Sequence, residues 1–194
     1  MISYYLPESL KVNGVEYEIR EDYRTALDIL SSFNDNSLTD EQKVQTVIEI
    51  LYWPITPPEE HLQEAFEKAV WFLDCGIEQD DTQKPRTMDW EQDAAIIFPA
   101  VNKVAGFDTR SPVLTHWWTF YGWFMEIDDG LFSQVLAIRQ KRAKGKRLDK
   151  WEQEFLKDNE KLCSLSGEQD NSKEDFFFFE NILNGDEKDG KYQF

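Results

Sequence analysis

Leu114–Ile127 reads LTHWWTFYGWFMEI and holds three of the chain's seven Trp residues. On a helix, its apolar side chains fall on both sides, and the broader stripe includes Leu114 and Met125. A helix that is apolar nearly all round is usually buried in the middle of a domain. We therefore predict that this segment is the core of the fold, carried by six aromatic side chains: Trp117, Trp118, Phe120, Tyr121, Trp123 and Phe124.

A partner or oligomer surface is the alternative for this segment, since Trp and Tyr are enriched at such surfaces. A membrane anchor is not expected, because the segment is shorter than the roughly 20 residues that span a bilayer and lacks basic flanks. The start of the chain, MISYYLPESL, shows no signal peptide pattern, so we expect a cytoplasmic protein. The two cysteines, Cys75 and Cys163, match no disulfide framework or zinc motif and are expected to be free thiols.

Toward the N-terminus, residues 10–19, LKVNGVEYEI, predict a short β-hairpin. Asn13 and Gly14 tolerate the positive φ angles of a type I′ turn, and they separate two β-prone runs. Two helices follow, the first capped by Asp22 and the second by Thr39 in a capping box.

Further helices are predicted on both sides of the aromatic segment, at residues 57–76, 89–106, 131–145 and 148–163. Asp89 is expected to cap the second of these helices, and Pro99 should kink or break it. Together the patterns predict a mainly α-helical bundle with a small N-terminal β-hairpin, in one domain over residues 1–165.

The last segment, residues 166–194, is acidic and polar, and it is predicted to be a flexible, largely disordered tail. Apolar side chains interrupt it as a motif made of Phe176, Phe177, Phe178, Phe179, Ile182 and Leu183. So many apolar side chains are poorly accommodated in water. They either fold back onto the body of the protein or form a short motif that orders when it binds a partner.

The formal net charge is −17, from 38 acidic and 21 basic residues, which repels nucleic acid and anionic membranes overall. Residues 139–150, RQKRAKGKRLDK, are the exception, with Arg139, Lys141, Arg142, Lys144, Lys146, Arg147 and Lys150 close together. This basic patch is either a docking site for an acidic partner or a set of cations that complements a helix C-terminus. In a self-association variant it meets another copy or the chain's own tail. Nucleic acid is not the expected partner, because no aromatic residue is interleaved in the patch.

No catalytic motif is present: the nucleophile-elbow, P-loop and dinucleotide-binding glycine patterns are all missing. His61 has no second His four residues on, and His116 is expected to be a hydrogen-bonded structural residue. The acidic pairs at 80–81 and 128–129 are expected to be caps and solvated turns. We therefore predict a protein that is not an enzyme and holds no metal or cofactor.

Three parts of the chain resemble a family of bacteriophage proteins, often labelled phage protein "gp fifteen", from tailed phages and prophages of Gram-positive bacteria. They are PESLKVNGVEYEIREDYRTALDIL at 7–30, DWEQDAAIIFPAVNKVAGFD at 89–108, and HWWTFYGWFMEI at 116–127 with LFSQVLAIRQKRAKGKRLDKWEQEFLKDN at 131–159. The Trp-rich segment followed by the basic turn and LDKWEQEF is the specific part.

This resemblance implies a role in building a long non-contractile, siphovirus-type tail. The expected role is that of a tail assembly chaperone, which binds the tape measure protein and recruits tail-tube subunits in the cytoplasm of the bacterial host. Such a chaperone is not expected to remain in the finished virion. The alternatives are a structural tail component that stays in the virion, or a nucleic-acid-associated phage factor that uses residues 139–150. No catalytic residues are implied by the resemblance.

Overall fold

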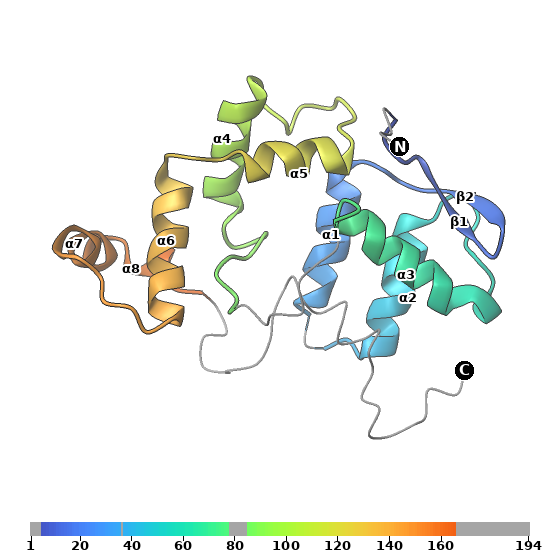
Figure 1. The fold of residues 1–194 in the computed structure, drawn as a ribbon, viewed down its shortest axis with the longest axis horizontal. Helices are drawn as coiled ribbons and strands as arrows, with labels where there is room; N and C mark the ends of the chain where they lie inside the picture. Colours follow the sequence, from blue (N-terminus) through green and yellow to red (C-terminus); the bar gives the residue numbers. More distant parts are fainter. Residues whose placement is uncertain (1–4, 36, 78–84, 166–194) are drawn as a thin grey trace. The chain divides into compact units, whose positions relative to one another are not determined.

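The computed structural model describes residues 5–35, 37–77 and 85–165 of the 194-residue chain (Figure 1). Within these residues the chain forms eight α-helices, a short 3-10 helix and two β-strands. The predicted mainly α-helical fold with a small N-terminal hairpin is confirmed. The predicted tail, residues 166–194, lies outside the described residues, and with it the motif Phe176–Phe179, Ile182 and Leu183.

The described residues form two compact units. Unit 1 contains residues 5–77 and 114–121, and unit 2 contains residues 85–113 and 122–165. Helix α5, Trp117–Met125, contributes its first five residues to unit 1 and its last four to unit 2. The single domain over 1–165 stays a prediction.

Unit 1 begins with the predicted hairpin, formed by β1, Ser9–Val12, and β2, Val15–Glu18. The strands are antiparallel, and the turn residues Asn13 and Gly14 have φ angles of 46° and 81°, as a type I′ turn requires. Leu10 and Val12 on β1 are buried, so this face of the hairpin packs on the helices. The packing explains how a two-stranded sheet, which is marginal alone, is stabilised.

Three helices of unit 1 carry most of its buried side chains: α1, Tyr23–Phe33; α2, Asp40–Leu51; and α3, Leu62–Leu73. Asp22 caps α1 by accepting a hydrogen bond from the main-chain N–H of Arg24. Thr39 and Gln42 form the predicted capping box of α2. The 3-10 helix η1, Glu59–His61, leads into α3. Local side-chain caps thus set where α1 and α2 start, whereas α3 has no such cap and begins later than the predicted residue 57.

Trp117 is the centre of the aromatic packing in unit 1. It is fully buried, and its Nε1 donates to the carbonyl of Leu73 at 2.8 Å. Phe120, one turn later, is also fully buried and stacks on Tyr23 with ring centroids 4.1 Å apart. Trp118 is half-buried, and its Nε1 donates to the Phe72 carbonyl at 2.8 Å. Helix α5 therefore fastens the end of α3 and the start of α1.

The prediction that Leu114 and Met125 belong to this apolar stripe is wrong, since each side chain is 61% exposed. Helix α5 begins at Trp117, because the residues before it are extended. Thr115 accepts from the main-chain N–H of Tyr23 and donates its own N–H to Asp22, and these bonds hold the extended backbone. Leu114 is therefore not on the helix at all.

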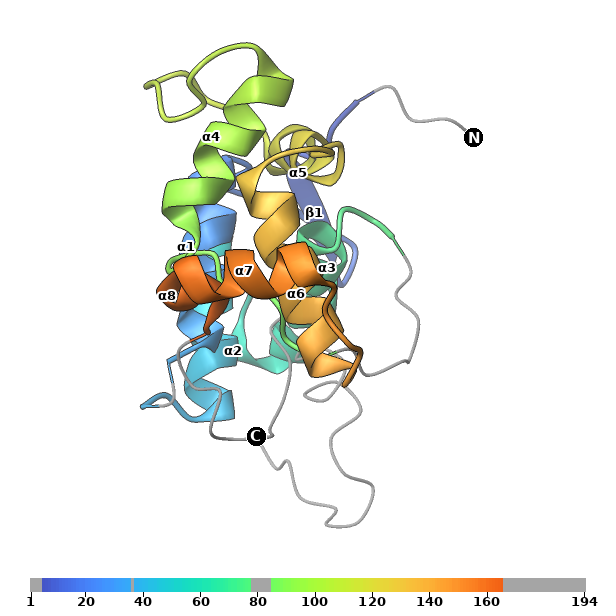
Figure 2. The same cartoon turned by 90° about the vertical axis from the view of Figure 1, so that its left-hand side faces the viewer.

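Unit 2 contains α4, Ala94–Ala105; α6, Leu131–Ala143; α7, Lys150–Asp158; and α8, Glu160–Cys163. Figure 2 shows α7 and α8 crossing α6. Helix α4 runs without a break past Pro99, so the predicted break is wrong, while the alternative, a kink, stays a prediction. It also starts after Asp93 rather than Asp89, which instead accepts from the N–H of Gln92 in a preceding turn.

The second half of α5 contributes two aromatic side chains to unit 2, both half-buried. Phe124 packs between Trp90 and Phe132, with ring centroids 4.7 Å and 5.6 Å away. Trp123 meets the edge of Phe107 at 5.5 Å. The aromatic segment thus supplies packing residues to each unit separately.

Replacing Trp117 by Ala should lower the free energy of unfolding by about 3–5 kcal/mol, because it leaves a cavity and removes the indole hydrogen bond to the Leu73 carbonyl. Urea titration followed by near-UV circular dichroism measures this loss. The matched control is Trp151→Ala, because Trp151 is 54% exposed and its loss should change stability by less than about 0.5 kcal/mol. Equal losses in the two variants would contradict the central position of Trp117.

Candidate partner-binding surfaces

Arg139 is the first residue of the predicted basic patch, and the prediction that it faces a partner is wrong. Only 4% of it is exposed. Its guanidinium pairs in bidentate fashion with Asp93, through Nη1–Oδ2 at 2.6 Å and Nη2–Oδ1 at 2.8 Å. It also donates to the carbonyls of Leu162 at 2.6 Å and Thr87 at 3.2 Å. The sequence could not separate Arg139 from its basic neighbours, because its partner lies far away in the chain.

This buried pair joins three helices of unit 2. Asp93 precedes α4, Arg139 lies on α6, and Leu162 lies on α8. A buried charge is tolerated only when it is paired and hydrogen-bonded, and here the planar guanidinium meets both carboxylate oxygens. Removing either partner would leave the other charge buried without compensation. The pair therefore has a structural role, since it connects α6 with α8 and with the start of α4.

Two further members of the patch hold unit 2 together from its surface. Lys141, on α6, forms a short ion pair with Glu152, on α7. Arg142 donates from Nη1 to the carbonyl of Cys163 at 3.2 Å. These contacts bring the ends of α6, α7 and α8 together, so both cations have structural roles within the unit.

The last four members, Lys144, Lys146, Arg147 and Lys150, are exposed and form no ion pair within residues 85–165. The turn that presents them follows a Schellman motif at the end of α6. The N–H of Lys146 bonds to the carbonyl of Lys141, and the N–H of Gly145 bonds to that of Arg142. Gly145 has a φ of 62°, a conformation that glycine adopts without steric cost.

Helix α7 starts at a capping box next to this turn. Asp149 accepts from the N–H of Glu152, and Glu152 accepts from the N–H of Asp149, both at 2.9 Å. The pKa of the Glu152 carboxyl is held below its usual value of 4.5, first by the hydrogen bond from Lys141 and then by that from Asp149. The Glu152 carboxylate therefore both caps α7 and pairs it with Lys141 of α6.

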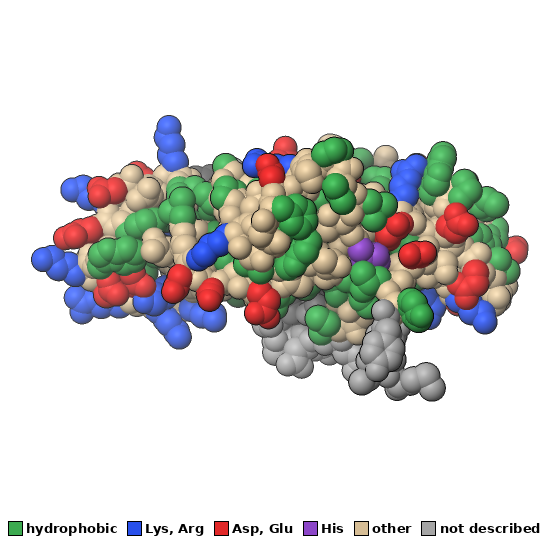
Figure 3. Space-filling view, turned by 90° about the horizontal axis from the view of Figure 1, so that it is seen from above, with side chains coloured by type: hydrophobic (Ala, Val, Ile, Leu, Met, Phe, Trp, Pro, Cys, Tyr) green, Lys and Arg blue, Asp and Glu red, His purple; other side chains and the backbone are tan. Residues whose placement is uncertain are grey.

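An aromatic pair lies on α7 directly after the basic turn. Trp151 is 54% exposed and Phe155 is half-buried, with ring centroids 5.4 Å apart. Together with the four exposed cations, they form what we call the basic-aromatic surface: Lys144, Lys146, Arg147, Lys150, Trp151 and Phe155. In Figure 3, Lys and Arg side chains gather at the left-hand end, where Figure 1 places α7.

Two shallow cavities flank α7. The first, about 510 Å³, is lined by Arg147, Leu148 and Lys150 among others. The second, about 380 Å³, is lined by Leu156 and Ser164 among others. The first cavity thus includes two cations of the basic-aromatic surface, Arg147 and Lys150, beside the apolar side chain of Leu148, a combination that suits an acidic and apolar peptide.

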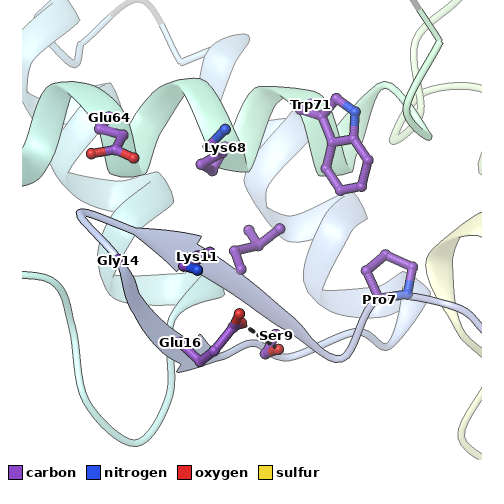
Figure 4. Close-up of a pocket in the computed structure, with 9 residues that line it drawn as sticks. Pro7, Ser9, Lys11, Gly14, Glu16, Glu64, Lys68 and Trp71 are labelled. Atoms are coloured by element: carbon purple, nitrogen blue, oxygen red, sulfur yellow. Dashed lines mark hydrogen bonds between the residues drawn. The ribbon is translucent and has the colours of Figure 1, made fainter.

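Unit 1 contains a separate groove between the hairpin and α3, about 580 Å³ in volume (Figure 4). The residues that line it include Pro7, Leu10, Lys11, Glu64, Lys68 and Trp71. Glu64 is already engaged, because its carboxylate accepts from the N–H of Asn13 at 3.0 Å. The sequence did not reveal this groove, since the hairpin and α3 are far apart in the chain.

The edge of β1 beside this groove has main-chain groups without partners in the described residues. The main-chain N–H of Ile19 donates to the Glu8 carbonyl, so Glu8 and Ile19 are a hydrogen-bonded pair. In an antiparallel hairpin such pairs alternate with pairs that are not hydrogen-bonded. Ser9 and Lys11 fall on the intervening pairs and direct their N–H and C=O groups away from β2. Such an edge can accept an extended segment by strand addition.

Both histidines form contacts within unit 1. The Nδ1 of His116 accepts from the N–H of Trp118, so its Nε2 carries the hydrogen and donates to the Pro7 carbonyl at 3.0 Å. His61 contacts the side-chain amide of Asn13 at 2.7 Å. Within the described ranges, no three His, Cys, Asp or Glu side chains are grouped to hold a metal ion. Residues 80–81 lie outside those ranges.

The two cysteines are free thiols, with Cys163 buried and Cys75 half-buried. Burial, with a smaller contribution from the charge of Asp74, raises the pKa of the Cys75 thiol to about 12. Burial also raises the pKa of Cys163. Both thiols are therefore protonated at neutral pH, which makes them poor nucleophiles.

The sequence profile of the family described as Bacteriophage Gp15 protein matches residues 2–165. The chain belongs to this family. Both units and the basic-aromatic surface lie inside the match, which ends where the described residues end. Neither the comparison with curated proteins nor the comparison with solved structures finds a match. None of the helices in the described part of this bacteriophage protein is long and apolar enough to cross a membrane.

Replacing Arg139 by Ala should destabilise the protein by about 3–5 kcal/mol, because Asp93 is left buried without its cation. The matched control is Lys144→Ala, which removes an exposed cation of the same predicted patch and should cost less than about 0.5 kcal/mol. Urea titration with far-UV circular dichroism distinguishes them. A loss of the same small size for both would show that Arg139 faces solvent.

Acidification should weaken the attachment of α7. A carboxyl whose pKa is lower in the folded than in the unfolded state stabilises the fold at pH values above its unfolded-state pKa. This contribution is lost as the pH falls through the folded-state pKa. The stabilisation by Glu152 is thus complete at pH values well above 4.5, the usual pKa of its carboxyl, and is lost at pH values below it. Glu152→Gln should flatten the acid side of the plot of urea midpoint against pH. Glu154→Gln, on the exposed side of α7, should keep the wild-type profile. Identical profiles for wild type and Glu152→Gln would contradict the assignment.

Proposed function

We propose that the protein is a non-enzymatic tail assembly chaperone that binds the tape measure protein while a siphovirus-type tail is built in the cytoplasm of the bacterial host. The observation that carries this proposal is the family match over residues 2–165. It is supported by the resemblance of the Trp-rich helix, basic turn and α7 to phage proteins encoded beside the tape measure gene. Tail-tube subunits are the second proposed partner.

The basic-aromatic surface is the part of the molecule that we assign to this contact. An assembly chaperone has to hold an apolar, aggregation-prone chain without aggregating itself, so its binding surface should combine apolar area with charge. Trp151 supplies the apolar area and is a residue type that often dominates binding energy. The exposed lysines and arginine beside it would attract acidic segments of the partner and set the rate of association.

Co-expression with the neighbouring tape measure protein, followed by pull-down at moderate salt, tests the proposal. We expect the two proteins to co-purify, and the tape measure protein to stay soluble only when this chain is present. Lys146→Glu/Arg147→Glu/Trp151→Ala should reduce the recovered complex by at least about tenfold, because a buried Trp anchor alone is often worth 2 kcal/mol or more.

The matched control is Lys11→Glu/Lys68→Glu, which reverses two exposed cations on unit 1 instead. It should leave recovery of the complex unchanged. If the wild-type proteins do not co-purify and this chain is found in purified virions, the chaperone role is wrong and a structural tail component is the better account.

A further inference from the structure

The basic-aromatic surface is a local exception in a strongly acidic chain. Its four cations lack ion pairs within the described part of unit 2, and Trp151 presents apolar area beside them. An exposed apolar patch with polar residues at its rim marks a binding site in many proteins. The chemistry that would cover it is an acidic segment with large apolar side chains.

The chain itself supplies such a segment after residue 165. The main chain is fixed up to Ser164, whose carbonyl accepts from Nε2 of Gln92 at 2.7 Å. The preceding carbonyl, of Cys163, accepts from Arg142. Ser164 also lines the 380 Å³ cavity beside α7. The residues after Leu165 therefore leave unit 2 beside α7, at the cavity lined by Leu156 and Ser164.

The residues that follow have complementary chemistry. Residues 166–194 carry eight acidic side chains against three lysines. Within them, residues 174–183 read EDFFFFENIL, so carboxylates stand on both sides of the four Phe. The eight residues 166–173 before this segment span up to about 28 Å when extended, twice the length of about 14 Å expected for the nine-residue helix α7.

We propose that residues 174–183 dock on the basic-aromatic surface of the same chain. The carboxylates of Glu174, Asp175 and Glu180 pair with the exposed cations of the basic turn, and the Phe side chains pack against Trp151 and Phe155. A short tether places the segment at an effective concentration of order 1 mM, so even an intrinsic dissociation constant of about 0.1 mM leaves it bound about nine-tenths of the time.

Docking of this segment has a consequence for the proposed function but does not depend on it. A tail held this loosely keeps the apolar area covered while the protein is alone. An acidic partner with higher affinity would displace it. The docking can be measured without any tape measure protein, so either proposal can fail while the other stands.

Hydrogen exchange of the full chain, read by mass spectrometry, tests the docking. The comparison is between wild type and Phe176→Ser/Phe177→Ser/Phe178→Ser/Phe179→Ser. If the docked segment protects α7, the main-chain amides of α7 should exchange about tenfold faster in the variant than in the wild type. Exchange in α1 and α2 should be unchanged. The matched control is Tyr192→Ser/Phe194→Ser, which removes aromatic residues outside the segment and should behave as wild type.

Charge reversal gives an independent measurement. Lys146→Glu/Arg147→Glu should raise exchange in α7 as the four-Ser variant does, and adding Glu174→Lys/Asp175→Lys should restore the protection. Lys68→Glu, an exposed cation on α3, should have no effect on α7.

Three results would overturn the proposal. The first is equal exchange in α7 for wild type and the four-Ser variant. The second is a change in α3 and β1 instead of α7, which would assign the tail to the groove of unit 1. The third is protection that grows when the protein concentration is raised from about 1 to about 100 μM, because a tail bound within its own chain is insensitive to dilution. That result would assign the tail to a second copy.

Discussion

The buried ion pair between Arg139 and Asp93 is the constraint on which unit 2 depends. It buries a guanidinium against the Asp93 carboxylate at the start of α4, the Leu162 carbonyl in α8 and the Thr87 carbonyl. Such a pair specifies an arrangement more than it adds net stability, because the cost of removing both charges from water offsets much of their attraction. It also joins α6 to α8 and to the start of α4, and the basic turn follows α6.

The surface of unit 2 follows from how its cations are distributed. Arg139 is buried, and Lys141 and Arg142 are used to join helix ends, whereas four further cations extend from a turn whose shape is set by Gly145. A run of seven basic residues therefore divides into a structural set and an exposed set. This division makes the exposed set a candidate for binding, since its cations form no ion pair within residues 85–165. Trp151, one residue after the turn, adds apolar area to it.

Local signals predicted much of the secondary structure. The Asn13-Gly14 turn and the caps at Asp22 and Thr39 act within a few residues, so they can be read from sequence directly. The predictions failed where distant partners intervene. Helix α5 starts late because residues 115–116 bond to the segment before α1. Helix α4 starts only after Asp93, whose carboxylate pairs with the distant Arg139. The groove beside β1 likewise depends on contact with α3, which no local pattern encodes.

By itself, the sequence determined the mainly helical class, the hairpin, the family and the presence of one basic segment in an acidic chain, because periodicity, turn residues and charge are properties of neighbours in the chain. Only the tertiary structure decided which cations are exposed, which aromatic side chains are buried and where the chain leaves unit 2. Those properties depend on residues far apart in sequence, such as Arg139 with Asp93 and Trp117 with Leu73, whose contacts exist only after the chain has folded.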